Sequence, residues 1–333
     1  MSKKDILSTL LIARQNLQSI LFGLCLFTGG LAKADPLMFG DFTYMVDGSP
    51  GEGFWINITD YPDLAVGPVV IPAVIDEKPV RNINSEAFNN CALITSVVIP
   101  ENVTFIGGDA FTSCTSLASV SLPQSLEVIE PFAFYNCDSL IHLTIPENVF
   151  SIGSRAFDEC NTLGEAYFLG NAPGDIGEDI FGTNTLMKVN FLASKTGYTT
   201  PRWRSKPNFI GYLTFARTPL TMWLLINQFP ESQDLASDPN GDGVNLLMAY
   251  ALNLDPKLNL SNSLPSPVFS PTQMSMTFYA GRTDISYSVV ASDGLVSWSA
   301  TGVSLTSLNA QKMRTATVAI SGPKKFMRLV VNR

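Results

Sequence analysis

Residues 133–146, AFYNCDSLIHLTIP, decide the fold, because their apolar pattern returns along the chain at a spacing of 23 residues. In each copy an alanine precedes a phenylalanine, a cysteine follows three positions later, and apolar strand-like residues come next. Such a period is typical of a solenoid, in which each coil repeats its neighbour. The recurring residues are Phe88, Phe111, Phe134 and Phe157, with Phe181 one residue out of phase, and Cys91, Cys114, Cys137 and Cys160.

Each copy predicts one short strand. Leu143 and Ile145 alternate with polar residues, which places the apolar pair on one face, and Pro146 ends the strand because it has no N–H to donate. A single unit has too few apolar side chains to offset the entropy of ordering its backbone, so units must stack. The chain is therefore predicted to be mainly β. We expect a right-handed coil whose strands form one parallel sheet, about five coils long and ending by Trp203.

The pattern Ala-Phe-x-x-Cys-x-x-Leu-x-x-Leu-x-Ile-Pro, as it stands in residues 133–146, resembles the BspA-type leucine-rich repeat. Residues 42–44 resemble the start of such a domain, and residues 197–203 resemble its end. The resemblance covers about residues 40–205 and implies a leucine-rich-repeat domain over 35–212. It also implies a secreted or cell-surface protein, since members of this family with assigned roles mostly bind host proteins or other cells.

The first 34 residues have the layout of a secretory signal peptide, with a basic leader, an apolar run over residues 20–31 and Ala32-Lys33-Ala34 as a cleavage site. An uncleaved membrane anchor is the alternative, although a span needs ~20 apolar residues. Cleavage removes four basic residues and one acidic residue, so the net charge changes from −8 to −11. This charge argues against nucleic acid and anionic membranes as partners. We expect a protein secreted or held on a bacterial surface, with no transmembrane segment after cleavage.

The repeated cysteines have three interpretations. They can form a ladder of small buried thiols, one per coil. Coils ~4.8 Å apart also lie within reach of a disulfide, which secretion permits. However, equivalent side chains point the same way, which suits the disulfide torsion badly, and no histidine accompanies them as a metal ligand. Free thiols are therefore favoured.

A partner is expected on the outward side of the repeat strands, because solenoids bind along an extended sheet face. The outward positions are small, mostly neutral and rich in hydroxyl groups, which suits a protein or a glycan. A plain solvated surface is the alternative interpretation. The predicted binding residues are Ser96, Val98, Ser119, Ser121, His142, Thr144, Glu165 and Tyr167.

Residues 213–260 are expected to form a helical linker. Thr221 is the predicted cap of a helix over residues 222–229, whose apolar residues form a stripe. A second helix is expected at about residues 245–252, with Pro256 beyond its end.

Between these helices lies SDPNGDGV, residues 237–244. Asp238, Asn240 and Asp242 place oxygens at alternate positions, and Val244 offers a carbonyl, as in the first half of a calcium loop. Position twelve of such a loop is acidic, but Ala249 stands there. The segment is either a calcium site or an Asx-type turn before the next helix, and the turn is favoured. No other cofactor is expected.

Residues 261–333 predict a small antiparallel, β-sandwich-like domain, with strands at 274–279, 285–291, 315–320 and 326–331. Two motifs, Leu254-Asp255-Pro256 and residues 293–298, DGLVSW, resemble a C-terminal module of bacterial secreted proteins. The preceding segment over residues 238–243, DPNGDG, fits that module as well, so the resemblance covers about residues 219–333. It leaves structural capping, anchoring and export sorting as its implied roles.

Catalytic motifs are scarce. His142 is the only histidine, and it occupies a repeat position filled by Ser96, Ser119 and Glu165 in other copies, so it is interpreted as a surface residue. No glycine-rich phosphate loop with a lysine is present. The favoured hypothesis is a non-enzymatic interaction protein. A structural spacer of the cell envelope is the alternative, followed by a secreted hydrolase that would depend on His142.

Overall fold

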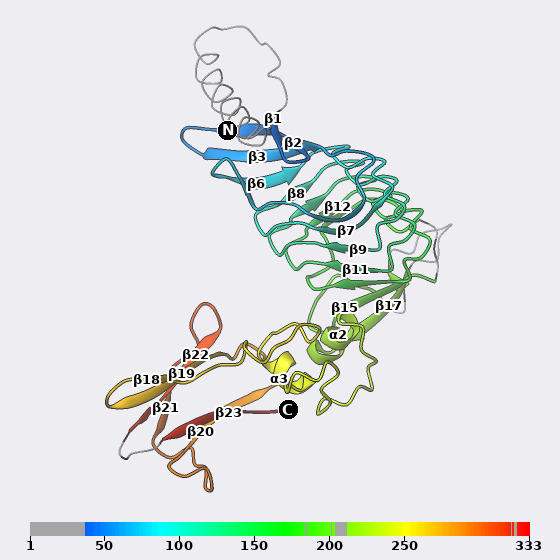
Figure 1. Cartoon of the computed structure of the whole chain (residues 1–333). Coiled ribbons are helices and arrows are strands. Elements are labelled where there is room, and N and C mark those ends of the chain that lie inside the picture. Colours follow the sequence, from blue (N-terminus) through cyan, green and yellow to red (C-terminus); the bar gives the residue numbers. More distant parts are fainter. Residues whose placement is uncertain are drawn as a thin grey trace, which may run out of the picture.

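The computed structural model describes residues 37–333 except 183, 185, 201, 204–211, 321, 323 and 324. The predicted signal peptide, residues 1–34, lies outside the described residues. Figure 1 shows a solenoid of stacked coils followed by a separate unit of two helices and antiparallel strands. The parallel coils and the antiparallel C-terminal unit confirm the predicted fold class.

One side of the solenoid is a long sheet of mostly short strands. It begins with three antiparallel strands, β1 (Leu37–Phe39), β2 (Phe42–Ser49) and β3 (Gly53–Asp60), and then runs parallel. The next strand, β6 (Lys78–Ile83), forms a hairpin with β5 (Val74–Ile75). The sheet continues through β8 (Phe105–Ile106), β10 (Val128–Ile129), β12 (Ser151–Ile152) and β14 (Asp175–Ile176).

The other side consists of the predicted repeat strands. The first group is β4 (Gly67–Val70), β7 (Ile94–Val98) and β9 (Ser119–Ser121). The second group is β11 (His142–Ile145), β13 (Glu165–Phe168), β15 (Lys188–Leu192), β17 (Tyr212–Arg217) and the antiparallel β16 (Arg202–Trp203). A long hydrogen bond from Ile141 N to Ala118 O, 3.5 Å, connects the two groups.

Three expectations about the solenoid are wrong. Parallel strands form on two sides of the coil rather than in one sheet, because coils of equal length bring every extended segment into register with its copy. Two-residue strands show no alternation in the sequence. The described residues contain seven parallel strands on the repeat side, not five. The sheet also continues past Trp203 to Arg217, since β17 pairs in parallel with β15.

The solenoid core is a column of identical side chains. The rings of Phe88, Phe111, Phe134 and Phe157 stack in sequence, with centroids 4.8, 4.9 and 5.2 Å apart. Beside them the four cysteines are buried free thiols, as favoured from the sequence. The thiols of Cys114, Cys137 and Cys160 each donate to the carbonyl of the phenylalanine 26 residues earlier, at 3.1–3.2 Å. The column is therefore held by ring stacking and by thiol hydrogen bonds between adjacent coils.

The C-terminal unit has two sheets. The first has the order β18 (Val268–Phe269), β19 (Gln273–Tyr279), β22 (Met313–Ala319) and β21 (Val303–Leu305). The second pairs β20 (Ser286–Ser292) with β23 (Phe326–Asn332). All four predicted strands are present within one or two residues, and their inner faces share one cluster that includes Met276, Phe278 and Val289.

The two predicted helices are also present, with one shift. Helix α2 covers Pro219–Ile226, not residues 222–229, because Thr218 rather than Thr221 caps it and Pro219 fits the first turn, where no N–H is needed. Helix α3 covers Leu246–Ala251 and is capped by Asn245. Among the described residues, no helix is both long enough and apolar enough to cross a membrane.

Candidate interaction surface

The predicted binding residues form two rows across the repeat strands. Ser96, Ser119, His142 and Glu165 are successive members of the first row, and strand register continues it to Lys188. Val98, Ser121, Thr144 and Tyr167 are successive members of the second, which continues to Asn190 and Phe215. The rows point away from the apolar core, because core residues such as Val97, Leu143 and Ala166 occupy the positions between them.

The rows are open to solvent over β4, β7, β9 and β11, and we call this part the open face. Val98, Ser119, Ser121 and His142 are exposed, while Ser96 and Thr144 are half-buried. Here the structure places six of the eight predicted residues side by side on a rigid sheet. The His142 ring lies 6.4 Å from that of Tyr167, which marks the border of the open face.

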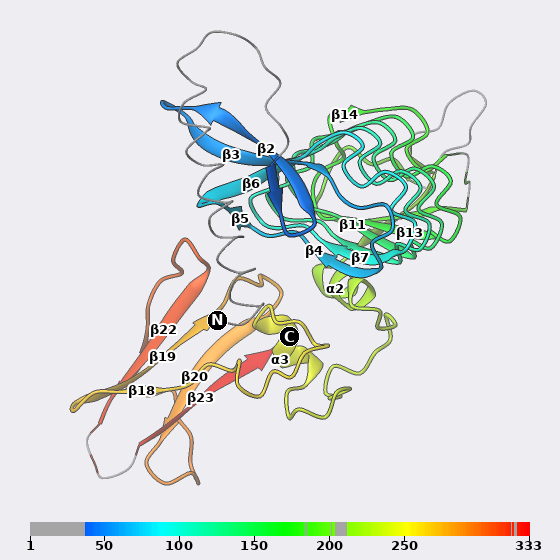
Figure 2. The same cartoon turned by 45° about the horizontal axis from the view of Figure 1, so that its top comes forward.

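Beyond that border the second row is covered, whereas the first row ends on Lys188, which is exposed. Tyr167 is only 3% exposed, so its prediction as an open binding residue is wrong, and Glu165 is half-buried. Helix α2 follows directly after β17 and contacts β15, and Figure 2 shows it beside the repeat strands. The chain therefore returns over its own last coils and covers the second row there.

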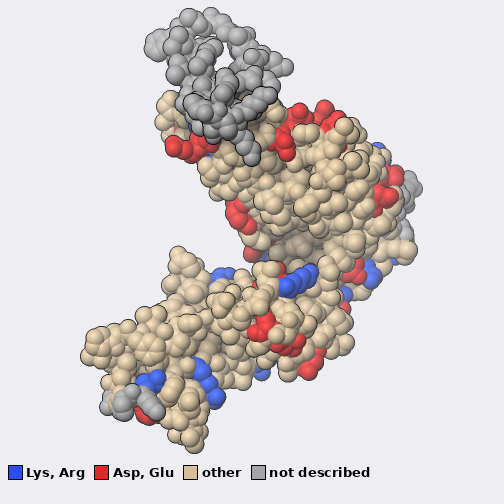
Figure 3. All heavy atoms as spheres, in the orientation of Figure 1, with Lys and Arg blue, Asp and Glu red and all other residues tan. Residues whose placement is uncertain are grey.

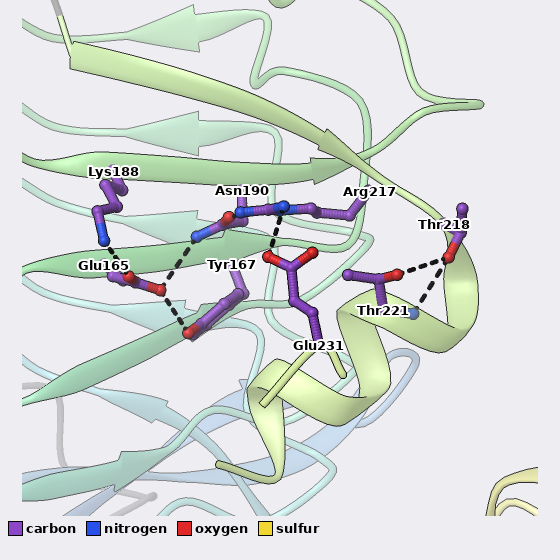
Figure 4. Close-up of polar contacts among 8 residues, drawn as sticks. All are labelled: Glu165, Tyr167, Lys188, Asn190, Arg217, Thr218, Thr221 and Glu231. Carbon is purple, nitrogen blue, oxygen red and sulfur yellow. Dashed lines mark hydrogen bonds and ion pairs between the residues drawn. The ribbon is translucent and has the colours of Figure 1, made fainter. Parts of the chain in front are cut away.

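A network of polar side chains fills this covered part, as Figure 4 shows. Glu165 accepts hydrogen bonds from Tyr167 Oη at 2.8 Å and Lys188 Nζ at 2.7 Å. Arg217 Nε donates to Asn190 Oδ1 at 3.0 Å, and its Nη1 lies 2.7 Å from Glu231 Oε1. Because Glu231 follows α2, this ion pair ties the C-terminal unit to the last solenoid strand.

Charge states in the network follow from its contacts. Burial alone would raise the carboxyl pKa of Glu165, but the Lys188 and Tyr167 hydrogen bonds outweigh it and the pKa is lowered. Burial, and then the bond to Glu165, raise the pKa of the Tyr167 hydroxyl. At neutral pH Glu165 is therefore an anion and Tyr167 a neutral donor, which stabilises the covered arrangement.

Sequence reasoning missed Lys188, Asn190, Arg217 and Glu231. The first two had a readable signal, since they follow Glu165 and Tyr167 by the same 23 residues. They escaped notice because the alanine, cysteine and proline of the repeat are absent from that copy. Arg217 and Glu231 carry no repeat signal, and only the return of the chain after β17 brings them together.

The Asp238–Asp242 loop is closed by its own hydrogen bonds. The Asp238 carboxylate accepts from Gly243 N at 2.7 Å and Asp242 N at 3.2 Å. The Asp242 carboxylate accepts from Leu260 N at 2.6 Å and Val244 N at 2.8 Å, and the Leu260 bond is the largest cause of its lowered pKa. Within the described part of the chain, no group of three or more histidine, cysteine, aspartate or glutamate side chains is placed to hold a metal ion. Val244 is buried and donates its N–H here.

Known proteins resemble the solenoid part of this chain. The family model of the BspA type leucine rich repeat region matches six copies over residues 81–200. A leucine-rich repeat protein from Bacteroides capillosus is 32% identical, with 40% of this chain and 97% of that one covered and a TM-score of 0.35. The leucine rich repeat protein of T. pallidum is 28% identical, with 54% and 83% covered and a TM-score of 0.44. No curated protein matches the chain.

A third solved structure, the pneumococcal vaccine antigen PcpA, is 21% identical, with 53% of this chain and 43% of that one covered and a TM-score of 0.37. None of these matches indicates an enzymatic family. The resemblance of about residues 219–333 to a C-terminal module of bacterial secreted proteins stays a prediction.

Proposed function

This chain belongs to the BspA-type leucine-rich-repeat proteins, and from that membership we propose that it is a secreted or cell-surface interaction protein that binds its ligand through the open face. The predicted signal peptide supports the location. The ligand class is a protein or a glycan. The binding residues would be Ser96, Val98, Ser119, Ser121, His142 and Thr144, without the covered Glu165 and Tyr167.

The proposal is supported by the uncharged sheet surface of the open face, which lies on the packed solenoid core. The strand spans that form the open face, GPVV, ITSVV, SVS and HLTI, contain no aspartate, glutamate, lysine or arginine. Behind them the inward side chains are buried in the continuous core. A surface that is already ordered loses little entropy when a ligand binds.

The proposal is tested with the full secreted chain on a glycan array and in a binding screen against host-cell surface proteins. Ser121→Arg places a long charged side chain on the open face, and we expect it to abolish binding. Ser151→Arg, on β12 of the other sheet, is the matched control and should bind as the wild type does. A ligand that is bound equally well by both variants would place the site elsewhere, and the absence of any ligand would favour the spacer hypothesis.

A further inference from the structure

The open face is apolar at its first strands. Val70 of β4 and Val98 of β7 are register partners, 68% and 44% exposed. Val66 and Leu93 precede the same two strands and are 75% and 46% exposed, and the Gly67 N–H donates to Leu93 O at 3.1 Å. Val66 and Leu93 lie at the beginning of these strands and Val70 and Val98 at the end, and exposed Pro68 lies between Val66 and Val70, so an apolar stripe runs along β4 beside the hydroxyl groups of β9 and β11. Contiguous exposed apolar surface is a feature of interaction sites.

The uncharged surface is bordered by carboxylates. Exposed Asp63 and Asp138 lie shortly before β4 and β11, at the beginning of the strands. Exposed Glu101 and Glu147 lie three residues beyond Val98 and Thr144, at the other end. Glu147 is paired with Lys195, so neither of these two side chains adds a free charge there, and Asp63, Asp138 and Glu101 form the border. On the side of the molecule in Figure 3, broad areas over the coils are likewise uncharged, and the red acidic groups lie toward their edges.

The same features disfavour two other ligands. A sugar ring packs on the flat apolar area of an aromatic side chain. The strands of the open face carry no phenylalanine, tyrosine or tryptophan, and the adjacent Tyr167 is covered. A second copy of this acidic chain would bring its own carboxylate border against this one, which is unfavourable.

The edge of the sheet also limits how a ligand lies. β4 is the first strand of its group, so one of its edges is unpaired. Gly67 and Ile71 use their N–H groups toward β7, and Pro68 has no N–H to offer an added strand. This disfavours extension of the sheet at Pro68, so we expect the ligand to pack across the face.

We propose that the open face binds a protein whose contact surface has an apolar centre flanked by lysine and arginine. This inference rests on the proposed function and names the class of its partner. Protein interfaces commonly join an apolar centre to a polar rim, and complementary charges at the rim speed encounter and exclude other partners.

The test uses the full secreted chain and three synthetic peptides with the same central block of valine and isoleucine, flanked by lysines, by glutamates or by serines. We expect the lysine-flanked peptide to bind about tenfold more tightly than the glutamate-flanked one at low salt, and the difference to shrink at high salt. Glu101→Lys should weaken lysine-peptide binding several-fold. The matched control is Glu127→Lys, beside β10 on the other sheet, which should leave it unchanged.

Equal binding of the lysine and glutamate peptides, or equal effects of the two Glu→Lys variants, would overturn the inference. Glycan binding that Ser121→Arg abolishes, without peptide binding, would overturn it and leave the proposed function intact. If no peptide, glycan or host-cell surface protein binds in a way that depends on Ser121, both proposals fail.

Discussion

The solenoid and the C-terminal unit are stabilised in different ways. The solenoid has one core in which the same side chains meet their own copies, from Tyr44 to Tyr212. The C-terminal unit has three smaller clusters in which no contact repeats another, such as the ring contacts of Phe278 with Tyr287 and of Trp223 with Tyr250. A repeated contact can be recognised from spacing alone. A single contact is only visible once the chain has folded.

The two regions should also differ in how far a destabilising substitution acts. A solenoid residue contacts the coils before and after it, so one substitution should destabilise several neighbouring coils. A substitution in a separate cluster of the C-terminal unit should destabilise only the two sheets around that cluster.

Removal of one ring from the solenoid column should have the largest effect. Phe134 is fully buried between Phe111 and Phe157, so Phe134→Ala leaves a cavity and should lower the free energy of unfolding by about 3–5 kcal/mol. Urea unfolding measures this. The control is Phe150→Ala, a ring 54% exposed in the following segment, which should change stability by less than about 0.5 kcal/mol. Equal losses would refute the column as the main support of the coil.

The corresponding change in the other region is Phe278→Ala. Phe278 is 1% exposed in the cluster of β19, β20 and β22, which shares no residue with the solenoid core. We expect a loss of about 3 kcal/mol confined to the C-terminal unit. Hydrogen exchange should show faster exchange in β19 and β22 and unchanged protection in β9 and β11. Loss of protection in both regions would show that they unfold as one.

Removal of the contact between the two regions should lower the stability by an intermediate amount. Arg217→Met leaves the buried Asn190 without its guanidinium donor and removes the ion pair to Glu231, at a cost of about 1–3 kcal/mol. Glu231→Gln removes only the half-exposed ion pair and should cost less than about 1 kcal/mol. Limited proteolysis after α2 should accelerate in the first variant only. Equal rates would show that Asn190 does not depend on Arg217.

The buried thiols should make the free energy of unfolding depend on pH, with a smaller effect than the substitutions above. Burial, followed by the charges of neighbouring groups, raises the pKa of Cys91 to about 12. An unfolded thiol ionises near pH ~8.5. The folded thiol stays protonated, so its contribution is intact below ~8.5 and is lost as pH rises toward 12. Between about pH 7.5 and about pH 9.5 urea stability should therefore fall by about 1 kcal/mol more in the wild type than in Cys91→Ala. An identical pH dependence would contradict this.

Calcium should have the smallest effect. We propose that the Asp238–Asp242 loop is a turn, because main-chain N–H groups already occupy both carboxylates. The melting temperature should be the same in chelator and in millimolar calcium. Asp242→Asn should lower it equally in both, since Leu260 and Val244 lose a charged acceptor. A rise with calcium in the wild type alone would establish the metal site instead.

Most of the solenoid could be predicted because its sequence pattern is local and repeated. The 23-residue period repeats an alanine, a phenylalanine and a cysteine, as in Ala133, Phe134 and Cys137, and it determines which side chains point inward and which point outward. The strands of the C-terminal unit were also readable, since Met274, Met276 and Phe278 alternate with more exposed residues. The outward positions of all eight predicted binding residues follow from the same alternation, and six of them lie on the open face.

The second sheet of the solenoid and the covered part of the outward rows could not be predicted, because they depend on contacts between segments distant in sequence. The second sheet arises only when coils stack, because two-residue strands such as Val128–Ile129 carry too short a pattern to recognise. The alternation predicts that Tyr167 points outward into solvent, yet α2 and the Arg217–Glu231 pair cover the second row at this point. The sequence alone therefore determined the repeat, its core and the direction of its side chains, since these follow from spacing. The tertiary structure decided which part of the outward face stays open, because coverage depends on where the chain goes after the last coil.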